Sequence, residues 1–255
     1  MRRFLLLAPV LVWLAGCATL DRALYDTSTA VAPPHPVYGT PVFNVVPEAQ
    51  EVAQARQAWA QIDAVARQHG VAVDLSGERL ARVRTVFAQL VAVAHRQQLP
   101  WEAHLLAAPD VNAFTFGGGI VVVFDGLFDG LVAPQDDEEL SAVLAHEIAH
   151  VTLLHVPTRQ TWAGFGSLAV KKTQDAYYRA AYTTEQEAEA DRIAALYMAL
   201  AGFDPMAAPR VWARAAQRSG SSAAQFAFLN DVAAHEEAIL SGPVADRTSH
   251  PPSPA

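Results

Sequence analysis

The chain has 255 residues, of which 52% are hydrophobic, and carries a formal net charge of −8 at neutral pH. This acidic balance argues against nucleic acid as a partner and against a polybasic patch that binds anionic lipid. The single cysteine, Cys17, excludes an intramolecular disulfide and any zinc site built from several cysteines. A chain of this length and hydrophobicity can bury the core of one domain.

The first residues predict export. Two arginines precede an apolar run over residues 4–15, which is shorter than a membrane span of roughly 20 residues and is typical of a secretory signal. Residues 14–17, Leu-Ala-Gly-Cys, resemble a bacterial lipobox. The resemblance implies that residues 1–16 are a signal peptide and that Cys17 is lipidated, which anchors a protein to a membrane without spanning it. The alternative is an ordinary signal peptide with an incidental cysteine.

The rest of the chain divides by composition. Residues 17–47 are rich in proline and predict an extended tether behind the lipidated cysteine. The alternative for this segment is an arm packed on the domain surface through Val42–Val46. Residues 48–240 predict the folded domain, and residues 241–255 an irregular, proline-containing tail that can reach the active site.

Two helices are predicted at the start of the domain. The first covers residues 48–69 and stops at Gly70, and the second covers roughly residues 77–98, with Ser76 as its cap and Pro100 after it. Apolar side chains at helical spacing predict the buried face of the second helix. They are Leu80, Val83, Phe87, Leu90, Val91 and Ala94.

Three short strands are predicted next. Residues 117–119 are three glycines that lead into a β-branched run, so a turn is expected between the second strand and the third. The strands are Glu102–Ala107, Ala113–Phe116 and Ile120–Phe124. The predicted fold class is α+β, mostly helical, with a small antiparallel sheet beside the next helix.

That helix is predicted from the acids at residues 136–139 to about Val156, where Pro157 stops it. The four acids are expected to cap the helix and face its dipole rather than to bind metal. Residues 158–182 fit either a flap or a partly buried helix. Further helices are predicted near residues 183–201, with Gly202 as the C-terminal cap, 205–218 and 223–240.

The sequence His-Glu-Ile-Ala-His occupies residues 146–150 of this helix. His146 and His150 are four residues apart and share one face, so both imidazoles can reach one metal ion. Zinc with two histidines, a third protein ligand and an open position is the usual catalytic arrangement, and Glu147 is placed to reach water bound there. The pattern predicts one zinc ion per chain; the alternative is coincidence on a solvated helix.

A third ligand has to come from elsewhere. Position 156 is Val, which excludes the metzincin pattern with a third histidine there. His155 lies about 140° from His150 around a continuous helix, so it is expected to cap or pack near the helix end. In the later acidic helix, Glu187 shares a face with Asp191. We predict Glu187 as the third ligand and Asp191 as the hydrogen-bond partner of a ligating histidine.

The other acids of that helix are expected to face solvent. Glu189 points about 160° away from Glu187, where an ion pair with Arg192 is expected. Alanines near the Glu187 face would let a partner helix approach closely. The alternative is a charged surface helix with no ligand role.

The two motifs together resemble a known family. HEIAH followed by E-x-E-A-D on a later helix is similar to the zinc metallopeptidase family that includes HtpX, BepA, the mitochondrial Oma-type peptidases and the CAAX prenyl endopeptidases. The likeness covers roughly residues 75–210. It implies zinc ligands at His146, His150 and Glu187, a catalytic base at Glu147, and a supporting carboxylate at Asp191.

The resemblance also implies a mechanism. Glu147 would take a proton from zinc-activated water and pass it to the leaving amine of a metalloendopeptidase reaction. An extended substrate is expected to pair with the third predicted strand as an added strand. The alternative is that this strand only forms part of the hydrophobic core. The substrate-binding residues of this prediction are Gly119, Ile120, Val121 and Val122.

Peptide hydrolysis also needs a hydrogen-bond donor to the negatively charged oxygen, the oxyanion, that forms on the scissile carbonyl. Family members often carry a His-Pro segment with a downstream Arg near the site. Here His250 precedes a proline and no such Arg follows in this sequence. His250 is therefore predicted to act as the catalytic donor or to occupy the open position of zinc as a latch. The alternative is that this histidine of the tail has no role in the site. The rival donors are Tyr177, Tyr178 and Tyr182.

Two functions follow as hypotheses. The first is a zinc endopeptidase that hydrolyses unfolded, misfolded or misassembled cell-envelope proteins. It would be lipid-anchored, would face the bacterial periplasm from the outer membrane, and would bind no nucleic acid. The second is an envelope chaperone or assembly lipoprotein whose protease activity is minor or latent.

Overall fold

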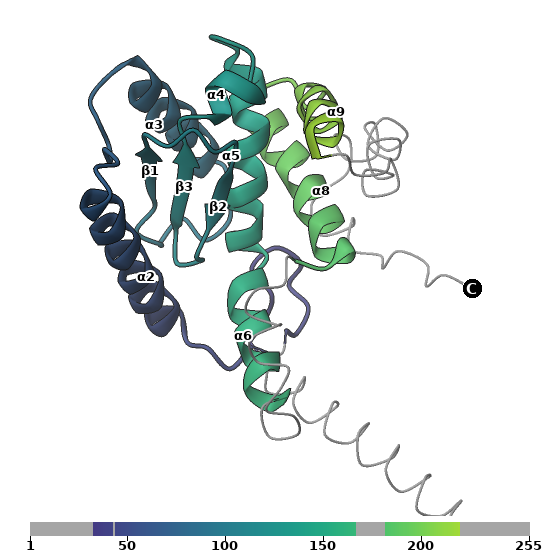
Figure 1. Cartoon of the computed structure of the whole chain (residues 1–255). Helices are drawn as coiled ribbons and strands as arrows, with labels where there is room; N and C mark the ends of the chain where they lie inside the picture. Colours follow the sequence, from purple (N-terminus) through teal and green to yellow (C-terminus); the bar gives the residue numbers. More distant parts are fainter. Residues whose placement is uncertain (1–32, 43, 167–181, 220–255) are drawn as a thin grey trace, which may run out of the picture.

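The computed structural model describes residues 33–42, 44–166 and 182–219. Within these ranges a three-stranded sheet has the strand order β1 (Glu102–Leu106), β3 (Ile120–Phe124), β2 (Ala113–Thr115) (Figure 1). Strand β2 pairs antiparallel with β3, whereas β1 pairs parallel with β3. The α+β class is confirmed, but the expectation of a purely antiparallel sheet is wrong. The reason is that β3 leaves the β2–β3 hairpin and enters the gap between the two earlier strands, so it runs in the direction of β1.

Three consecutive glycines form the hairpin turn. Gly117, Gly118 and Gly119 have φ angles of 78°, 58° and 92°, in the left-handed region that strains other residues. A Cβ atom on Gly118 would lie 2.8 Å from the Cβ of Ala55 in helix α2 (Glu48–Gln68). The turn therefore needs glycine both for its backbone and for the close approach of α2.

The two faces of the sheet belong to two cores. Because side chains alternate along a strand, Val121 and Val123 face one way and Ile120 and Val122 the other. The first pair packs in the main core with helices α3 (Glu78–Val91), α5 (Asp137–Thr152) and α8 (Thr184–Ala201). The second pair packs in a smaller core under α2. Strand β3 is thus buried on both faces, which accounts for its uninterrupted β-branched run.

Helix α3 is shorter than expected at both ends. Its N-terminal cap is Gly77 instead of Ser76, without a side-chain hydrogen bond, and it ends at Val91 instead of near residue 98. Turns follow, in which Arg96 has a φ of 59°. The short helix α4 (Leu127–Gly130) comes between β3 and α5.

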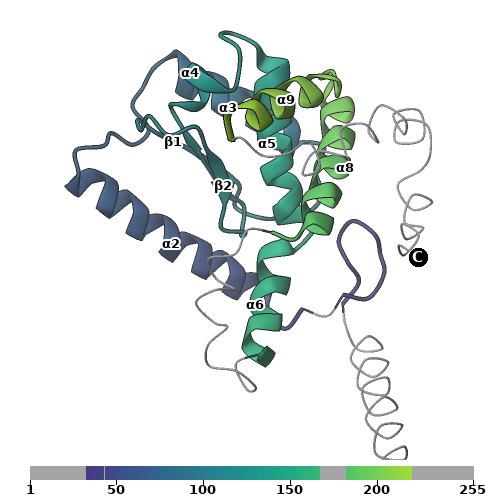
Figure 2. The ribbon, with the colours of Figure 1, turned by 45° about the vertical axis from the view of Figure 1, so that its right-hand side comes forward.

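The expected long helix after residue 136 is two helices. Helix α5 ends at Thr152, and helix α6 (His155–Gly166) begins three residues later (Figure 2). Leu154 lies between them with a φ of 59°. The prediction that Pro157 stops the helix is wrong, because Pro157 lies in the first turn of α6, where its missing N–H has no helical partner to lose.

Helix α8 has nearly the expected bounds and the expected C-terminal cap. Thr183 and Gln186 form a capping box at its start, and Gly202, with a φ of 88°, ends it. Buried alanines, Ala190 and Ala194 among them, line its packing against α5. Helix α9 (Ala207–Ser219) follows close to its prediction. The helix expected near residues 223–240 and the tail at 241–255 lie outside the described residues.

Residues 33–42 form a loop that packs on the domain instead of extending away from it. An isolated bridge between Pro34 and Pro41 closes the loop, and both His35 and Val37 are buried. Figure 2 shows the loop beside the α5–α6 junction. The described residues 33–42 thus pack as an arm on the domain, through His35 and Val37 rather than through Val42–Val46, where Val45 is exposed. No helix in the described ranges has the length and hydropathy of a membrane span.

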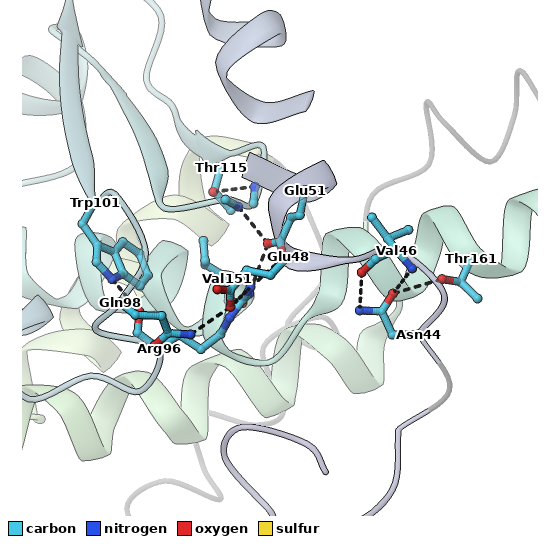
Figure 3. A network of polar contacts seen from close by, with 12 residues as sticks. Asn44, Val46, Glu48, Glu51, Arg96, Gln98, Trp101, Thr115, Val151 and Thr161 are labelled. Atoms are coloured by element: carbon cyan, nitrogen blue, oxygen red, sulfur yellow. Dashed lines mark hydrogen bonds and ion pairs between the residues drawn. The ribbon is translucent and has the colours of Figure 1, made fainter. Parts of the chain in front are cut away.

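A buried ion pair joins α2 to the turns after α3, and a hydrogen bond from the same arginine reaches the end of α5 (Figure 3). The side chain of Arg96 is 3% exposed and binds the Glu51 carboxylate through two nitrogens, at 2.6 and 3.1 Å. Its Nη1 also donates to the carbonyl of Val151 at 2.8 Å, near the helix end, where carbonyls need partners from outside the helix. Glu51 accepts the N–H of Gly118 at 2.8 Å. The network holds α2, the hairpin turn and the end of α5 together.

Candidate metal centre

Helix α5 carries the His-Glu-Ile-Ala-His sequence through the middle of the molecule. Its first turn is capped by Asp136, which accepts the N–H of Glu139 at 3.0 Å. The Glu139 side chain is 3% exposed and pairs with Arg214 of α9. Asp136 therefore caps the helix, as expected, and Glu139 forms an ion pair with α9. Every residue of the helix from Glu139 to Thr152 is buried, so packing fixes the helix on all sides.

Three predicted side chains converge beside α5. The Nε2 atoms of His146 and His150 are 3.0 Å apart. The Oε2 atom of Glu187, from α8, lies 3.1 Å from Nε2 of His146 and 3.7 Å from Nε2 of His150. These three residues are the group of potential metal ligands found in the described residues. Two imidazole nitrogens and one carboxylate oxygen form a donor set that suits zinc and leaves a fourth position open.

Asp191 orients the first histidine. Its Oδ1 lies 2.8 Å from Nδ1 of His146, so Nδ1 donates to Asp191 and Nε2 faces Glu187 and His150. Glu187 and Asp191 are one turn apart on α8, which places one carboxylate on each nitrogen of the same ring. The structure therefore brings Asp191 to the place that helix geometry assigned to it.

The charges around the two histidines favour a cation. Burial alone would lower the pKa of His146, but Asp191 and Glu187 outweigh it and hold this pKa well above its usual value. Burial raises the pKa of Glu187, yet bonds from both histidines hold it well below its usual range. Burial lowers the pKa of His150 to about 3. An anionic Glu187 and a neutral His150 suit a divalent metal, whereas His146 would have to release its second proton to bind one.

Glu147 is buried beside the first histidine. Its side chain lies on α5 next to His146, and burial raises its pKa to about 7, although His146 acts in the opposite direction. A carboxyl group with a pKa near neutral can both accept and release a proton at physiological pH. Glu147 has the properties of a general acid–base group.

His155 and Glu189 were not expected near this centre. Nδ1 of His155 lies 2.8 Å from Nδ1 of His150, and its Nε2 lies 3.1 Å from Oε2 of Glu189. The expectation of a solvent-side ion pair for Glu189 is corrected: the acid faces His155. The angle expected for His155 assumed a continuous helix, whereas the helix breaks at Leu154. No sequence signal marks this break, because leucine rarely adopts a left-handed conformation.

The predicted substrate strand is placed differently. Residues Gly119–Val122 were expected to offer a free edge, but β3 is the central strand and pairs with β1 on one side and β2 on the other. Ile120, Val121 and Val122 are also buried. The structure contradicts this assignment and supports the alternative that these residues are core. The edge strand next to α5 is β2.

Comparison with known families matches residues 78–174 to peptidase family M48. Over these residues the chain is similar to M48 peptidases. The matched segment includes His146, Glu147 and His150 and ends before Glu187. Because the family is one of metallopeptidases, a metal cofactor at this centre is implied.

Several relatives support the same assignment. The chain is 30% identical over 143 residues to the mitochondrial metalloendopeptidase OMA1 of Arabidopsis thaliana, covering 51% of this chain and 29% of the relative. It is 30% identical over 162 residues to the OMA1 of Schizosaccharomyces pombe, covering 58% and 47%. It is 31% identical over 161 residues to the beta-barrel assembly-enhancing protease of Yersinia pestis, covering 54% and 32%. The chain spans less than half the length of these relatives. Together with the family match, their names support a metalloendopeptidase.

Aromatic rings flank the candidate metal centre. The ring of Tyr182 stacks on the ring of His150, with centroids 3.7 Å apart and an interplanar angle of 17°. Trp212 of α9 meets the ring of His146 edge-on at 5.2 Å. Tyr182 was one of three predicted donors, whereas Trp212 was missed because nothing in the sequence links α9 to the motif. The other predicted groups, Tyr177, Tyr178, His250 and Cys17, lie outside the described residues.

Proposed function

We propose that the chain is a zinc-dependent endopeptidase. The observation that carries the proposal is the convergence of two imidazoles and a carboxylate beside a buried acid with a pKa near neutral. His146, His150 and Glu187 would hold the metal, and Asp191 would keep His146 in the tautomer that binds it. Zinc bound there would act as a Lewis acid that activates water and polarises the scissile carbonyl.

The chain's own residues would then carry the proton. Glu147 takes a proton from the attacking water and delivers it to the leaving amine, a transfer that suits its raised pKa. Tyr182, beside His150, is the donor candidate for the oxyanion among the described residues. Burial of Glu147 keeps competing water away from the proton it holds.

The substrate would bind at the sheet edge. Strand β2 has β3 as its sheet partner in the described ranges and lies against α5. An extended peptide can therefore add to β2, in place of the β3 position expected from the sequence. Such a mode requires an unfolded segment, because only an extended chain offers unpaired backbone groups.

The proposed substrates are unfolded, misfolded or misassembled envelope proteins. Support comes from the secretory and lipobox-like start of the sequence and from relatives named as beta-barrel assembly-enhancing proteases. With Cys17 lipidated, the enzyme would be anchored to the bacterial outer membrane and face the periplasm. The second candidate, an assembly factor with latent protease activity, is favoured by the same names and would keep the metal without rapid cleavage.

One experiment separates the candidates. The full chain, loaded with zinc, is mixed with an unfolded reporter protein, beside Glu147→Gln and the exposed control Glu185→Gln. We expect Glu147→Gln to keep zinc and to lose cleavage by about 10²-fold or more, and the control to behave as the unaltered chain. If the unaltered chain binds zinc but does not cleave, the assembly factor is favoured. Equal cleavage by Glu147→Gln and the unaltered chain would refute the proposed mechanism.

A further inference from the structure

The second nitrogen of His150 faces another histidine. Nε2 of His150 faces His146 and Glu187, so it is the metal-binding nitrogen of the proposed function. A neutral imidazole that binds metal through Nε2 carries its proton on Nδ1. That proton must be donated to Nδ1 of His155, 2.8 Å away, because no other partner of His150 Nδ1 is present among the described residues.

This donation determines the tautomer of His155. Its Nδ1 accepts, so its Nε2 carries the proton and donates to Glu189 Oε2 at 3.1 Å. The side chain of His155 is 5% exposed and that of Glu189 is 29% exposed. A chain of oriented hydrogen bonds thus runs from the candidate ligand His150 through a buried imidazole to a carboxylate.

The two histidine ligands are supported differently. His146 donates directly to the Asp191 carboxylate, whereas His150 reaches the Glu189 carboxylate through one intervening imidazole. A direct carboxylate on the second histidine would have to occupy the position of His155. The break between α5 and α6 supplies that position, because the left-handed Leu154 turns the chain so that His155 folds back toward His150.

A separate segment holds this arrangement in place. Nε2 of His35 donates to the carbonyl of Leu153 at 3.1 Å, and its Nδ1 accepts the N–H of Val37 at 3.1 Å. The Tyr38 hydroxyl approaches Glu189: burial raises the pKa of that carboxyl, but the bond from His155 and the Tyr38 hydroxyl hold it below its usual value. The loop of residues 33–42 therefore contacts both ends of the hydrogen-bond chain, the helix break that positions His155 and the carboxylate that receives its proton.

We propose that His155 and Glu189 are a positioning pair that orients His150 for metal binding, and that the loop of residues 33–42 holds the pair. This inference rests on the proposed metal site but not on proteolysis. It gives the second glutamate of the E-x-E-A-D sequence a role distinct from that of Glu187. It also makes a segment far from the motif in sequence part of the metal centre.

The test measures zinc affinity by chelator competition in chains that carry Glu147→Gln, so proteolysis does not interfere. We expect His155→Phe and Glu189→Ala to weaken zinc binding by about 10- to 100-fold, the usual effect of losing a group that supports a metal ligand. Glu189→Gln keeps an acceptor and should recover part of this loss, and Tyr38→Phe should weaken zinc less than Glu189→Ala. The matched control Glu185→Gln, exposed on the same helix, should bind zinc normally.

Two further measurements separate positioning from general stability. The visible spectrum of the cobalt-substituted protein should change in His155→Phe but not in Glu185→Gln, whereas a purely structural role would lower only the melting temperature of the metal-free chain. Long-range ¹H–¹⁵N NMR of the zinc-loaded parent chain should show protonated Nδ1 on His150 and protonated Nε2 on His155. The reverse tautomer on His155, or normal zinc affinity in folded His155→Phe, would overturn the inference. No zinc binding by the parent chain would instead refute the proposed function.

Discussion

Removing Arg96 from its buried pair with Glu51 should be among the most destabilising single changes in this fold. Both side chains are at most 3% exposed, and Arg96 makes three hydrogen bonds of 3.1 Å or less to Glu51 and to the carbonyl of Val151. Arg96→Met keeps most of the side-chain volume but leaves the Glu51 carboxylate buried with the N–H of Gly118 as its remaining close partner. Breaking a buried pair by removing one partner costs about 3–5 kcal/mol.

The assay is urea denaturation of the metal-free chain, followed by circular dichroism. We expect Arg96→Met to lower the free energy of unfolding by about 3–5 kcal/mol, and Arg96→Met with Glu51→Gln to lower it by less than the sum of the two single changes. Arg82→Met is the control, because Arg82 pairs with the half-exposed Asp137, and should cost about 1 kcal/mol or less. A loss below about 1 kcal/mol for Arg96→Met would refute the argument that this pair holds the end of α5.

The other predictions concern a glycine turn, an acid and an aromatic ring. Gly118→Ala combines a left-handed backbone with a contact of 2.8 Å and should destabilise the metal-free chain by about 2–4 kcal/mol; Gly70→Ala, with the same backbone region and open space around it, should cost about 1 kcal/mol. Burial raises the pKa of Glu139, but bonds from Arg214 and a backbone N–H hold it below its usual range. Its stabilising effect is therefore present above the unfolded pKa of about 4.3 and lost as pH falls through the folded value. Melting curves of Glu139→Gln should lie below those of the unaltered chain at pH 7 and converge with them in acid; a constant gap would contradict this sign. Tyr182→Phe keeps the stacked ring, so zinc affinity should be unchanged while kcat on an unfolded reporter falls by about 10²-fold; an unchanged kcat would exclude its hydroxyl as the donor.

The parts of the centre that lie within one helix follow from the sequence. His146 and His150 are four residues apart on α5, and Glu187 and Asp191 are four residues apart on α8, so helix geometry alone places each pair on one face. The buried alanines of α8 were also an adequate sign of close packing. Local spacing therefore predicts the convergence of these residues once the two helices are assumed to meet.

The parts of the fold and of the centre that depend on changes in chain direction do not follow from the sequence. The central position of β3 comes from the crossover between β1 and β2, which no local pattern encodes, so the expected free edge at Gly119–Val122 was assigned to the wrong strand. The place of His155 depends on the left-handed Leu154, a conformation that tertiary packing imposes. Glu189 was misplaced because its face on α8 was judged without its neighbour from α6.

The packed loop of residues 33–42 limits how far the metal centre can lie from a lipid anchor at Cys17. If Cys17 is lipidated as proposed, only residues 17–32 separate the acyl chain from the point where the loop joins the domain beside the metal centre. A chain of that length, fully extended, spans about 55 Å at most. The cleavage site would therefore work only within a shallow layer next to the membrane, so polypeptides still close to that membrane would meet it before those that have diffused away.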